Sequence, residues 1–277
     1  KVSSLGIDPI EKKPLYHFYP GSRILSLGTF GCNFTCDFCQ NWQISQKKPA
    51  VRDVSLREVN QIALKKDVIG IAYTYSEPSI WFEYIYDTAK MVSENSMKNV
   101  IVSNGFINNK PLRELIPYLD AANIDLKAYS NDFYKEYCNG RLQPVLDSIE
   151  LLFSQGVHIE LTTLVIEGVN DSETELKELF SWIRNLSPEI PLHLSRYFPN
   201  YKMEKSATSI TVLKKAYELA SQYLDYVYMG NVNIEKCRNT ICPQCSKEII
   251  ERSNYSIEKL RDKGHCGNCG YEINVVI

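Results

Sequence analysis

Three cysteines crowd into one short segment and limit what this chain can fold around. Cys32, Cys36 and Cys39 have the spacing C-x3-C-x2-C and directly follow an apolar run at residues 24–27, which predicts a strand. Thiolates this close repel one another, and a loop containing glycine and asparagine suits wrapping around an object better than packing in a core. The segment therefore predicts an iron–sulfur cube with three protein ligands and one open iron.

Cysteine usage and charge balance narrow the class of protein. Seven of the nine cysteines fall in C-x2-C or C-x3-C groups, which favours metal binding in a reducing compartment and so predicts a cytoplasmic location. With 31 basic and 33 acidic side chains, the chain has no net positive charge that would indicate binding to nucleic acid or to an anionic membrane. No apolar run approaches a membrane span, so we expect a soluble chain. Because residue 1 is lysine, we expect a processed or trimmed form.

Strand and helix signals alternate along most of the sequence. Strands are expected at residues 24–27, 68–73, 99–102, 122–127, 157–165, 191–195 and 226–229, and helices lie between them, one opened by a capping box at Ser55. Such units imply a parallel sheet with helices outside, as a partial or complete β/α barrel or a doubly wound sheet. We predict an extended N-terminal arm (1–22), a partial (β/α) barrel (23–230) and a ribbon domain (231–277).

Polar side chains at the ends of successive predicted strands favour the barrel. These strand-end residues are Ser76 and Glu77, Ser103 and Asn104, Asp125 and Lys127, Thr162 and Thr163, and His193 and Arg196. In a barrel, such positions converge at the C-terminal mouth, where active sites are built. The cysteine loop follows the first predicted barrel strand, so we expect it at the same mouth.

A second cysteine group lies near the C-terminal end of the sequence. Two C-x2-C knuckles separated by 20 residues suit one tetrahedral thiolate site made by Cys242, Cys245, Cys266 and Cys269. This spacing predicts a zinc-ribbon or rubredoxin-like domain in which the metal, zinc or a single iron, is the main determinant of folding. Iron would suggest an electron relay if the ribbon packed near the cysteine loop. Seven Lys and Arg against six Asp and Glu in 231–277 do not indicate a nucleic-acid-binding ribbon.

The first cysteine motif, with Phe38 just before its third cysteine, resembles the radical S-adenosylmethionine (AdoMet) superfamily. The resemblance implies a [4Fe-4S] cluster on Cys32, Cys36 and Cys39 that receives an electron from a donor and passes it into bound AdoMet. The resulting 5′-deoxyadenosyl radical abstracts hydrogen from a substrate. The protein's part is to hold the cofactor, exclude water and aim the radical.

The same resemblance implies which residues contact AdoMet. The segment 76–78 resembles the GGE-type element that binds the methionine amine, with both glycines replaced, and 165–168 resembles the element that flanks adenine. Asn41 and the segment 125–127 match positions of the pyruvate formate-lyase activating enzyme-like subgroup that contact polar groups of AdoMet. The implied cofactor-binding residues are Phe38, Asn41, Ser76, Glu77, Asn104, Asp125, Lys127 and Ile166.

A narrower resemblance covers four segments. GCNFTCDFCQNWQISQ, TYSEPSIWFEY, PLHLSRYFPNYKM and the terminal double knuckle are similar to the radical enzyme of the AmmeMemoRadiSam system. This similarity implies Amme-type and Memo-type partner proteins. Members of that family usually carry a further cysteine-containing segment before the DPIEKKPLYHF element, so we expect a preceding piece to be missing here. The substrate does not follow from the sequence.

Simpler alternatives remain open. The three cysteines of the loop would form a structural zinc site if a distant histidine completed it, and the chain would then be a zinc-stabilised binding module without redox chemistry. Within the enzyme class, the alternative is an activase that installs a glycyl radical on a partner protein. In the simpler interpretation, Glu77 is an acidic residue at a helix N-terminus, where the helix dipole stabilises its charge. Asp125 and Lys127 would then form an ion pair at a strand end.

Several other residues have two interpretations. Cys138 is expected to be an inert, partly buried thiol and Cys237 a free one. Phe38, Trp81 and Ile166 either serve the site or belong to the core. Four further residues either line the substrate pocket or pack the barrel: His193, Arg196, Tyr197 and Tyr201.

Overall fold

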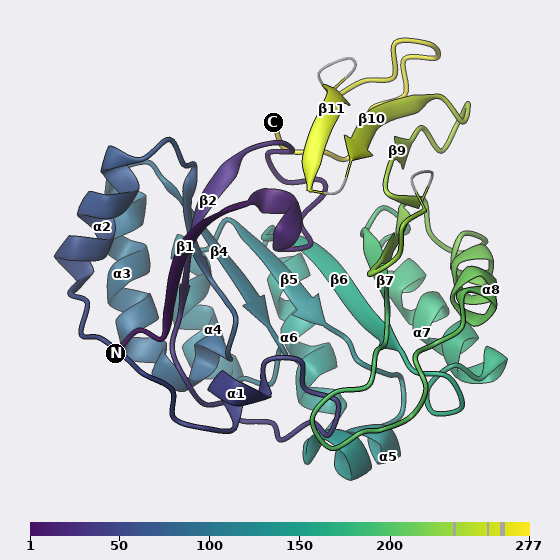
Figure 1. Cartoon of the computed structure of the whole chain (residues 1–277). Helices are drawn as coiled ribbons and strands as arrows, with labels where there is room; N and C mark the ends of the chain where they lie inside the picture. Colours follow the sequence, from purple (N-terminus) through teal and green to yellow (C-terminus); the bar gives the residue numbers. More distant parts are fainter. Residues whose placement is uncertain (235–236, 254, 261–263) are drawn as a thin grey trace.

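The computed structural model describes residues 1–234, 237–253, 255–260 and 264–277, and its main element is one curved sheet (Figure 1). Eight strands pair in sequence order. They are β1 (Ser4–Pro9), β2 (Arg23–Gly28), β3 (Gly70–Tyr73), β4 (Lys98–Ser103), β5 (Ala121–Asp125), β6 (His158–Val165), β7 (Leu192–Arg196) and β8 (Val227–Gly230). The strands are short and largely buried, as expected for a sheet covered on both faces.

The pairing pattern decides between the two expected topologies. Strands β2 to β8 are parallel to their neighbours, whereas β1 runs antiparallel to β2. Consecutive order means that the chain winds in one direction, which excludes a doubly wound sheet. Among the described strands no pairing joins β1 to β8, so the barrel is partial, as predicted.

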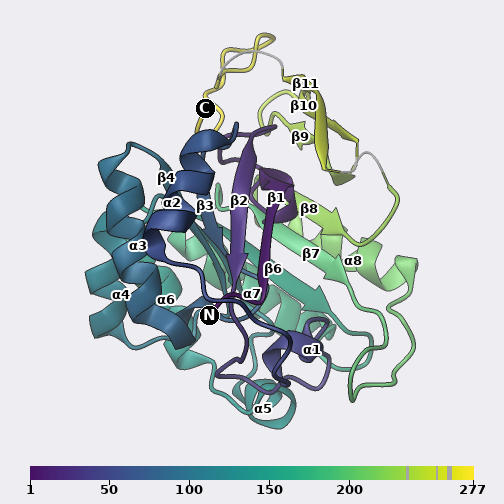
Figure 2. The ribbon, with the colours of Figure 1, turned by 60° about the vertical axis from the view of Figure 1, so that its left-hand side comes forward.

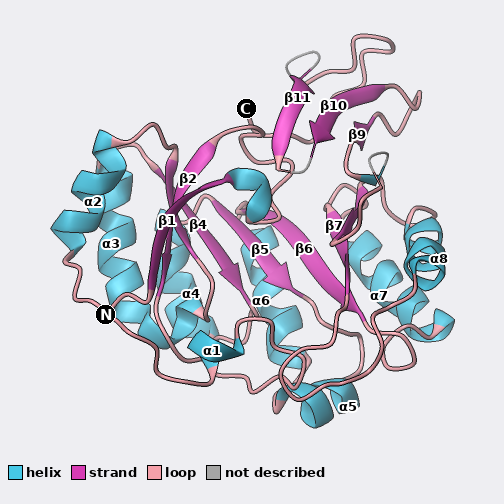
Figure 3. Ribbon diagram, in the orientation of Figure 1, coloured by secondary structure: helices cyan, strands magenta, loops and turns pink. Residues whose placement is uncertain are grey.

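Helices form an outer layer around this sheet, as Figures 2 and 3 show. The helices are α1 (Trp42–Ser45), α2 (Leu56–Lys65), α3 (Phe82–Glu94), α4 (Asn109–Leu115), α5 (Asn131–Phe133), α6 (Gln143–Ser154), α7 (Glu173–Leu186) and α8 (Ile210–Ala220). Serine side chains cap the N-termini of α2, α7 and α8; for example, Ser55 Oγ accepts a hydrogen bond from Glu58 N at 3.2 Å, as the predicted capping box requires. Shorter turns are η1 (Ile10–Lys12), η2 (Pro78–Trp81), η3 (Ile116–Tyr118) and the π-helical η4 (Tyr134–Cys138).

The N-terminal arm is more regular than the sequence suggested. Its residues Ser4–Pro9 form β1, which pairs with β2 from Ser4 opposite Gly28 to Pro9 opposite Arg23. The turn η1 then brings Lys12 and Lys13 to the inside of the barrel, where both line a cavity. Apolar and polar residues alternate little within Ser4–Pro9, so the formation of β1 depends on its pairing with β2.

The ribbon packs at the end of the barrel opposite to the cysteine loop. Its strands β9 (Thr240–Ile241), β10 (Glu248–Ser253) and β11 (Ser256–Leu260) lie above the N-terminal ends of the barrel strands, whereas α1, which follows the cysteine loop, lies at the bottom (Figures 1 and 2). The arm joins the ribbon region through backbone hydrogen bonds from Tyr19 N to Val276 O and from Val276 N to His17 O. In the part of the chain that the structure describes, no helix is long and apolar enough to cross a membrane.

Candidate active site

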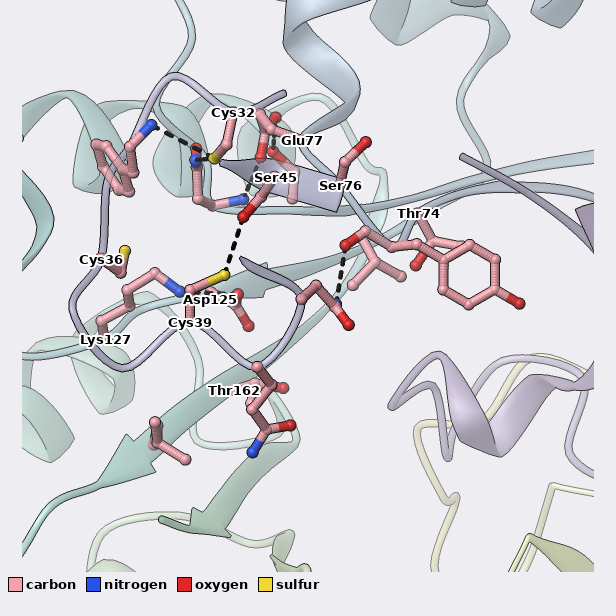
Figure 4. Close-up of a pocket in the computed structure, with 18 of the residues that line it drawn as sticks. Cys32, Cys36, Cys39, Ser45, Thr74, Ser76, Glu77, Asp125, Lys127 and Thr162 are labelled. Atoms are coloured by element: carbon pink, nitrogen blue, oxygen red, sulfur yellow. Dashed lines mark hydrogen bonds and ion pairs between the residues drawn. The ribbon is translucent and has the colours of Figure 1, made fainter. Parts of the chain in front are cut away.

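A cavity of about 490 Å³ opens at the C-terminal ends of the barrel strands (Figure 4). The three cysteines of the loop line it together with side chains from the ends of β3, β4, β5 and β6, which is the convergence expected of a barrel mouth. Among the lining residues are Cys32, Cys36, Phe38, Cys39, Asn41, Ser45, Ser76, Glu77, Ser103, Asn104, Asp125, Lys127 and Thr162. The structure thus brings together seven of the eight residues that we predicted to contact AdoMet.

The eighth of these residues, Ile166, lies elsewhere. It is fully buried just beyond β6, its backbone N donates to Asn170 Oδ1 at 2.8 Å, and it is not among the lining residues. In this structure Ile166 therefore occupies the core position that we had considered as the alternative.

Backbone hydrogen bonds fix the cysteine loop on both sides of Cys36. Thr35 N donates to Cys138 O at 3.0 Å, and Asp37 N donates to Tyr137 O at 2.9 Å. These contacts anchor the loop to the π-helical turn η4, which the sequence had not revealed. They also place the buried thiol of Cys138 beside Cys36, so Cys138 is not the isolated residue that its place in the sequence suggested.

The thiols of the loop are held in their neutral form when no metal is bound. Burial and the nearby Glu77 carboxyl raise the pKa of Cys32 to about 12, and contact with Cys138 together with burial raises the pKa of Cys36 well above its usual range. Burial also raises the pKa of Cys39. Metal coordination deprotonates a thiol outright, so these groups fit a bound metal cluster better than they fit free thiolates.

Polar groups are already directed at two of the sulfur atoms. Asn104 Nδ2 lies 3.6 Å from Cys32 Sγ, and Phe34 N donates to the same sulfur at 3.4 Å. Ser45 Oγ lies 3.1 Å from Cys39 Sγ. Hydrogen bonds to ligand sulfurs tune the potential of an iron–sulfur cluster. The sequence reasoning missed Ser45, and only its closeness to the motif hinted at it.

Glu77 is a buried carboxyl without a basic partner among the described residues. It accepts hydrogen bonds from Ser79 N at 3.0 Å, Ser103 Oγ at 2.8 Å and Asn104 N at 2.9 Å. Burial raises its pKa even though these three donors oppose the shift. A cationic ligand group in the cavity would stabilise the ionised form, and AdoMet carries both an ammonium and a sulfonium. The residues present therefore fit this cofactor.

The turn before Glu77 adopts a conformation that glycine would favour. Tyr75 has φ of 72°, in the left-handed region that glycine adopts without strain. Its strain is offset by contacts on both sides: Asn41 Nδ2 donates to Tyr75 O at 2.9 Å, and Tyr75 OH donates to Asp8 Oδ2 at 2.5 Å. These contacts hold the turn that presents Glu77 to the cavity.

Asp125 and Lys127 form an ion pair of 2.9 Å at the edge of the cavity. Burial opposes the charge on Lys127, but the carboxylate of Asp125 outweighs burial and raises the pKa of Lys127. Both side chains line the cavity (Figure 4), so the ion pair and the predicted cofactor contact are compatible.

The four C-terminal cysteines form a second and different thiol group. Their ligand atoms lie within 4.8 Å of one another, with Cys242 Sγ 3.6 Å from Cys269 Sγ and Cys245 Sγ 3.5 Å from Cys266 Sγ. A tetrahedral site with metal–sulfur bonds of about 2.3 Å separates its sulfurs by about 3.8 Å. The group therefore fits a single tetrahedral metal ion. Sulfur ligands of this kind accept zinc or iron, so the geometry leaves the metal open.

The positions of the cysteine loop and of the four ribbon cysteines bear on two alternatives: an electron relay through the ribbon and a structural zinc site on the loop. The ribbon lies at the far end of the barrel, so the condition for an electron relay, packing near the cysteine loop, is not met (Figure 1). A zinc site on the loop would need a histidine, yet no histidine lines the cavity in the described ranges. His17, His158 and His193 instead lie around Glu160 at the other end of the strands.

Comparisons with known proteins agree with this geometry. Residues 26–180 match the model of the Radical SAM superfamily. The chain is similar to an uncharacterized protein of Methanocaldococcus jannaschii, with 41% identity over 286 residues that cover 100% of this chain and 85% of that protein. It is also similar to the pyruvate formate-lyase-activating enzyme of Clostridium pasteurianum, with 20% identity over 56% of this chain and 67% of that enzyme.

A solved structure shares the fold. Streptococcus suis SuiB bound to S-adenosylmethionine superposes with a TM-score of 0.61 and 15% identity, over 76% of this chain and 52% of SuiB. The family match covers the cysteine loop and the strand ends that line the cavity. This chain therefore belongs to the Radical SAM superfamily.

Proposed function

We propose that Cys32, Cys36 and Cys39 hold a [4Fe-4S] cluster and that the enzyme uses it to cleave AdoMet reductively and start radical chemistry on a substrate. One observation carries this proposal: the three thiols and the buried carboxyl of Glu77 share one cavity of about 490 Å³ at the barrel mouth. When bound, the cluster supplies the electron and AdoMet supplies the adenosyl group that takes hydrogen from the substrate.

The residues around the cavity position the cofactor and limit access of water. Glu77 is fixed by three donors, so its carboxylate is ready to pair with a positive group of AdoMet. The Lys127 ammonium stabilises negative charge near Cys36. Apolar side chains complete the lining and restrict water around the reacting atoms: Phe34, Phe38, Val102 and Leu164.

We further propose that the enzyme acts in the AmmeMemoRadiSam system with Amme-type and Memo-type partners and a separate electron donor. The support is the similarity of four sequence segments. Three of them fall at the cysteine loop, at the Glu77 turn and at β7 with its following loop, and the fourth is the double knuckle. Reconstitution with candidate partners tests this assignment, because a cognate set should produce a modified product only when AdoMet is present.

A second candidate is a glycyl-radical-enzyme activase. The similarity to the Clostridium pasteurianum activating enzyme favours it. An activase would generate a glycyl radical on its protein partner under anaerobic conditions, and electron paramagnetic resonance would detect that radical directly.

The proposed chemistry is tested by anaerobic reconstitution with iron and sulfide, chemical reduction and addition of AdoMet. We expect 5′-deoxyadenosine from the wild-type enzyme and none from Cys36→Ala. Cys237→Ala is the matched control, because Cys237 belongs to neither thiol group, and it should keep wild-type activity.

Two results would contradict the proposal. Iron-free protein containing only zinc after reconstitution would favour the binding-module alternative. Retained 5′-deoxyadenosine formation in Cys36→Ala would show that the cluster ligands are assigned wrongly.

A further inference from the structure

A second cavity of about 380 Å³ adjoins the cofactor cavity. Lys12, Pro14, Ser195 and Asn231 line both cavities, so the two share a wall inside the barrel. The second cavity extends along β7 and β8 toward the ribbon, on the side where β1 and β8 do not pair. Its other lining residues come from the arm, the barrel and the ribbon, and include Glu11, Tyr16, His193, Arg196, Arg238 and Tyr255.

The basic side chains of this cavity outnumber the acidic ones. Lys12, Arg196 and Arg238 line it, and Glu11 is the one carboxyl among its described lining residues. The charge of Lys12 is offset by Asp8, whose Oδ1 lies 2.8 Å from Lys12 Nζ, so the excess comes from Arg196 and Arg238. Burial raises the pKa of Glu11, which favours its neutral form. The cavity therefore has an excess of positive charge and attracts a negatively charged group.

Arg196 is positioned to bind such a group. Its Nε donates to Thr208 O at 2.7 Å, and its guanidinium lies 4.7 Å from the centre of the Phe198 ring. These two contacts hold the plane of the guanidinium. No partner for its terminal nitrogens is found within the described residues, so they remain available for a carboxylate or phosphate, which arginine binds through two parallel hydrogen bonds.

Two acidic groups near the cavity do not cancel this preference. Glu160 is fully buried behind His193 and accepts hydrogen bonds from His193 Nε2 at 2.7 Å and from the backbone N of His17 at 2.7 Å. These donors satisfy its oxygens, and Glu160 is not among the residues that line the cavity. Glu11 Oε2 is buried and has no hydrogen-bond partner among the described residues, and burial raises the pKa of this carboxyl, which weakens its opposition to an anion.

We infer that this second cavity binds the substrate, and that the substrate is a small molecule whose carboxylate or phosphate group is held by Arg196. The inference rests on the proposed function, because it places the substrate beside the cofactor cavity where hydrogen is abstracted. The volume lies within the range of about 300–1,000 Å³ typical of small-molecule sites. A glycyl-radical activase would instead need to admit a neutral backbone loop.

Anion binding by the reconstituted enzyme tests the inference. The probes are inorganic phosphate and succinate, added with AdoMet at constant ionic strength, and the readout is the rise in melting temperature with probe concentration. We expect a saturable rise for at least one probe. Arg196→Gln should weaken the apparent affinity by at least about tenfold, since a bidentate charged contact is lost.

Two further variants separate the charge of Arg196 from its geometry and control for the loss of an arginine elsewhere. Arg196→Lys retains the charge without the planar fork and should bind with intermediate affinity. Arg184→Gln is the matched control: Arg184 is exposed on α7, its Nη1 donates to Tyr223 O, and it lines neither cavity, so the variant should bind like wild type.

The outcomes separate this inference from the proposed function. Equal anion affinity in wild type and Arg196→Gln, or no saturable binding of either probe, would overturn the inference. The proposed function is judged independently by 5′-deoxyadenosine formation in the wild-type enzyme. If that product forms while the anions do not bind, the enzyme is a radical AdoMet enzyme with a different substrate class.

Discussion

The two cysteine sites of this chain use the same ligand atom in opposite ways. The loop at Cys32, Cys36 and Cys39 faces a cavity lined with polar strand-end residues, and its sulfurs are not part of any close four-ligand group among the described residues. The ribbon brings Cys242, Cys266 and their partners within 4.8 Å of one another. An incomplete ligand set leaves room for a reacting molecule, whereas a complete one serves the fold.

Breaking the ribbon site should produce the largest effect on stability. Cys242→Ser is expected to lose the ribbon metal and to destabilise the ribbon by several kcal/mol, because its core is small and metal binding supplies folding free energy. Metal analysis by mass spectrometry and limited proteolysis of the ribbon measure the effect.

The cluster at the loop should survive this change. Cys242→Ser is expected to keep wild-type iron and sulfide content at Cys32, Cys36 and Cys39, and Cys237→Ser should behave like wild type in both assays. Loss of the loop cluster in Cys242→Ser would show that the two sites are coupled, contrary to their separation in the fold.

Lowering the pH should destabilise the junction between the ribbon and the barrel before it affects the cysteine loop. His17 joins the ribbon to the barrel, with Nδ1 2.6 Å from Asn274 O and Nε2 2.6 Å from Tyr228 OH. Burial lowers the pKa of His17 to about 4, although Glu160 opposes the shift. Between the ordinary value near 6.5 and this value the unfolded state binds more protons, so stability present above pH 6.5 is lost as pH falls.

The expected loss is about 2 kcal/mol between pH 6.5 and 5, at roughly 1.4 kcal/mol per pH unit. Thermal or denaturant unfolding measured at a series of pH values gives this slope for the wild type. His17→Asn should show a flatter dependence, because it removes the titrating group. An unchanged slope in the variant would assign the acid sensitivity to another group.

A single glycine should show how tightly the loop is packed. A Cβ on Gly140 would overlap the ring of Phe34, which lies fully buried inside the cysteine loop. Gly140→Ala is expected to destabilise the fold by about 1–3 kcal/mol and to reduce cluster content, because the ring must shift. Cluster absorbance and iron content provide the measurement.

Gly6→Ala is the matched control, since a Cβ there meets no atom within 4 Å. This variant should keep wild-type stability and iron content. Equal behaviour of the two variants would mean that the packing of Phe34 does not determine how the loop holds its cluster.

Much of the barrel could be predicted because its signals are local. Apolar runs and caps such as Ser55 located the strands and helices, and polar residues such as Asn104 and Lys127 marked the strand ends that surround the cavity. The parallel arrangement then followed from general rules of connection. These features depend on neighbours within a few residues.

Features that depend on distant partners were missed. Strand β1 exists because β2 pairs with it, and Cys138 acquires its place only through the backbone bonds of Thr35 and Asp37 to η4. Lys13 reaches the cavity with its Nζ 2.7 Å from Asp8 Oδ2, a contact that no periodic pattern predicts. Ile166, predicted from a family motif to contact AdoMet, is buried and does not line the cavity, and its role stays a prediction.

The joining of the arm to residues near Val276 has a consequence for the order in which the protein folds. Tyr16 O accepts a hydrogen bond from Arg252 Nη2 at 2.6 Å, so one wall of the second cavity depends on segments more than 230 residues apart. During synthesis the cysteine loop and the first strands can associate early, whereas this wall must wait until the ribbon has left the ribosome. The emerging chain can therefore form its cluster-binding loop well before the second cavity is complete.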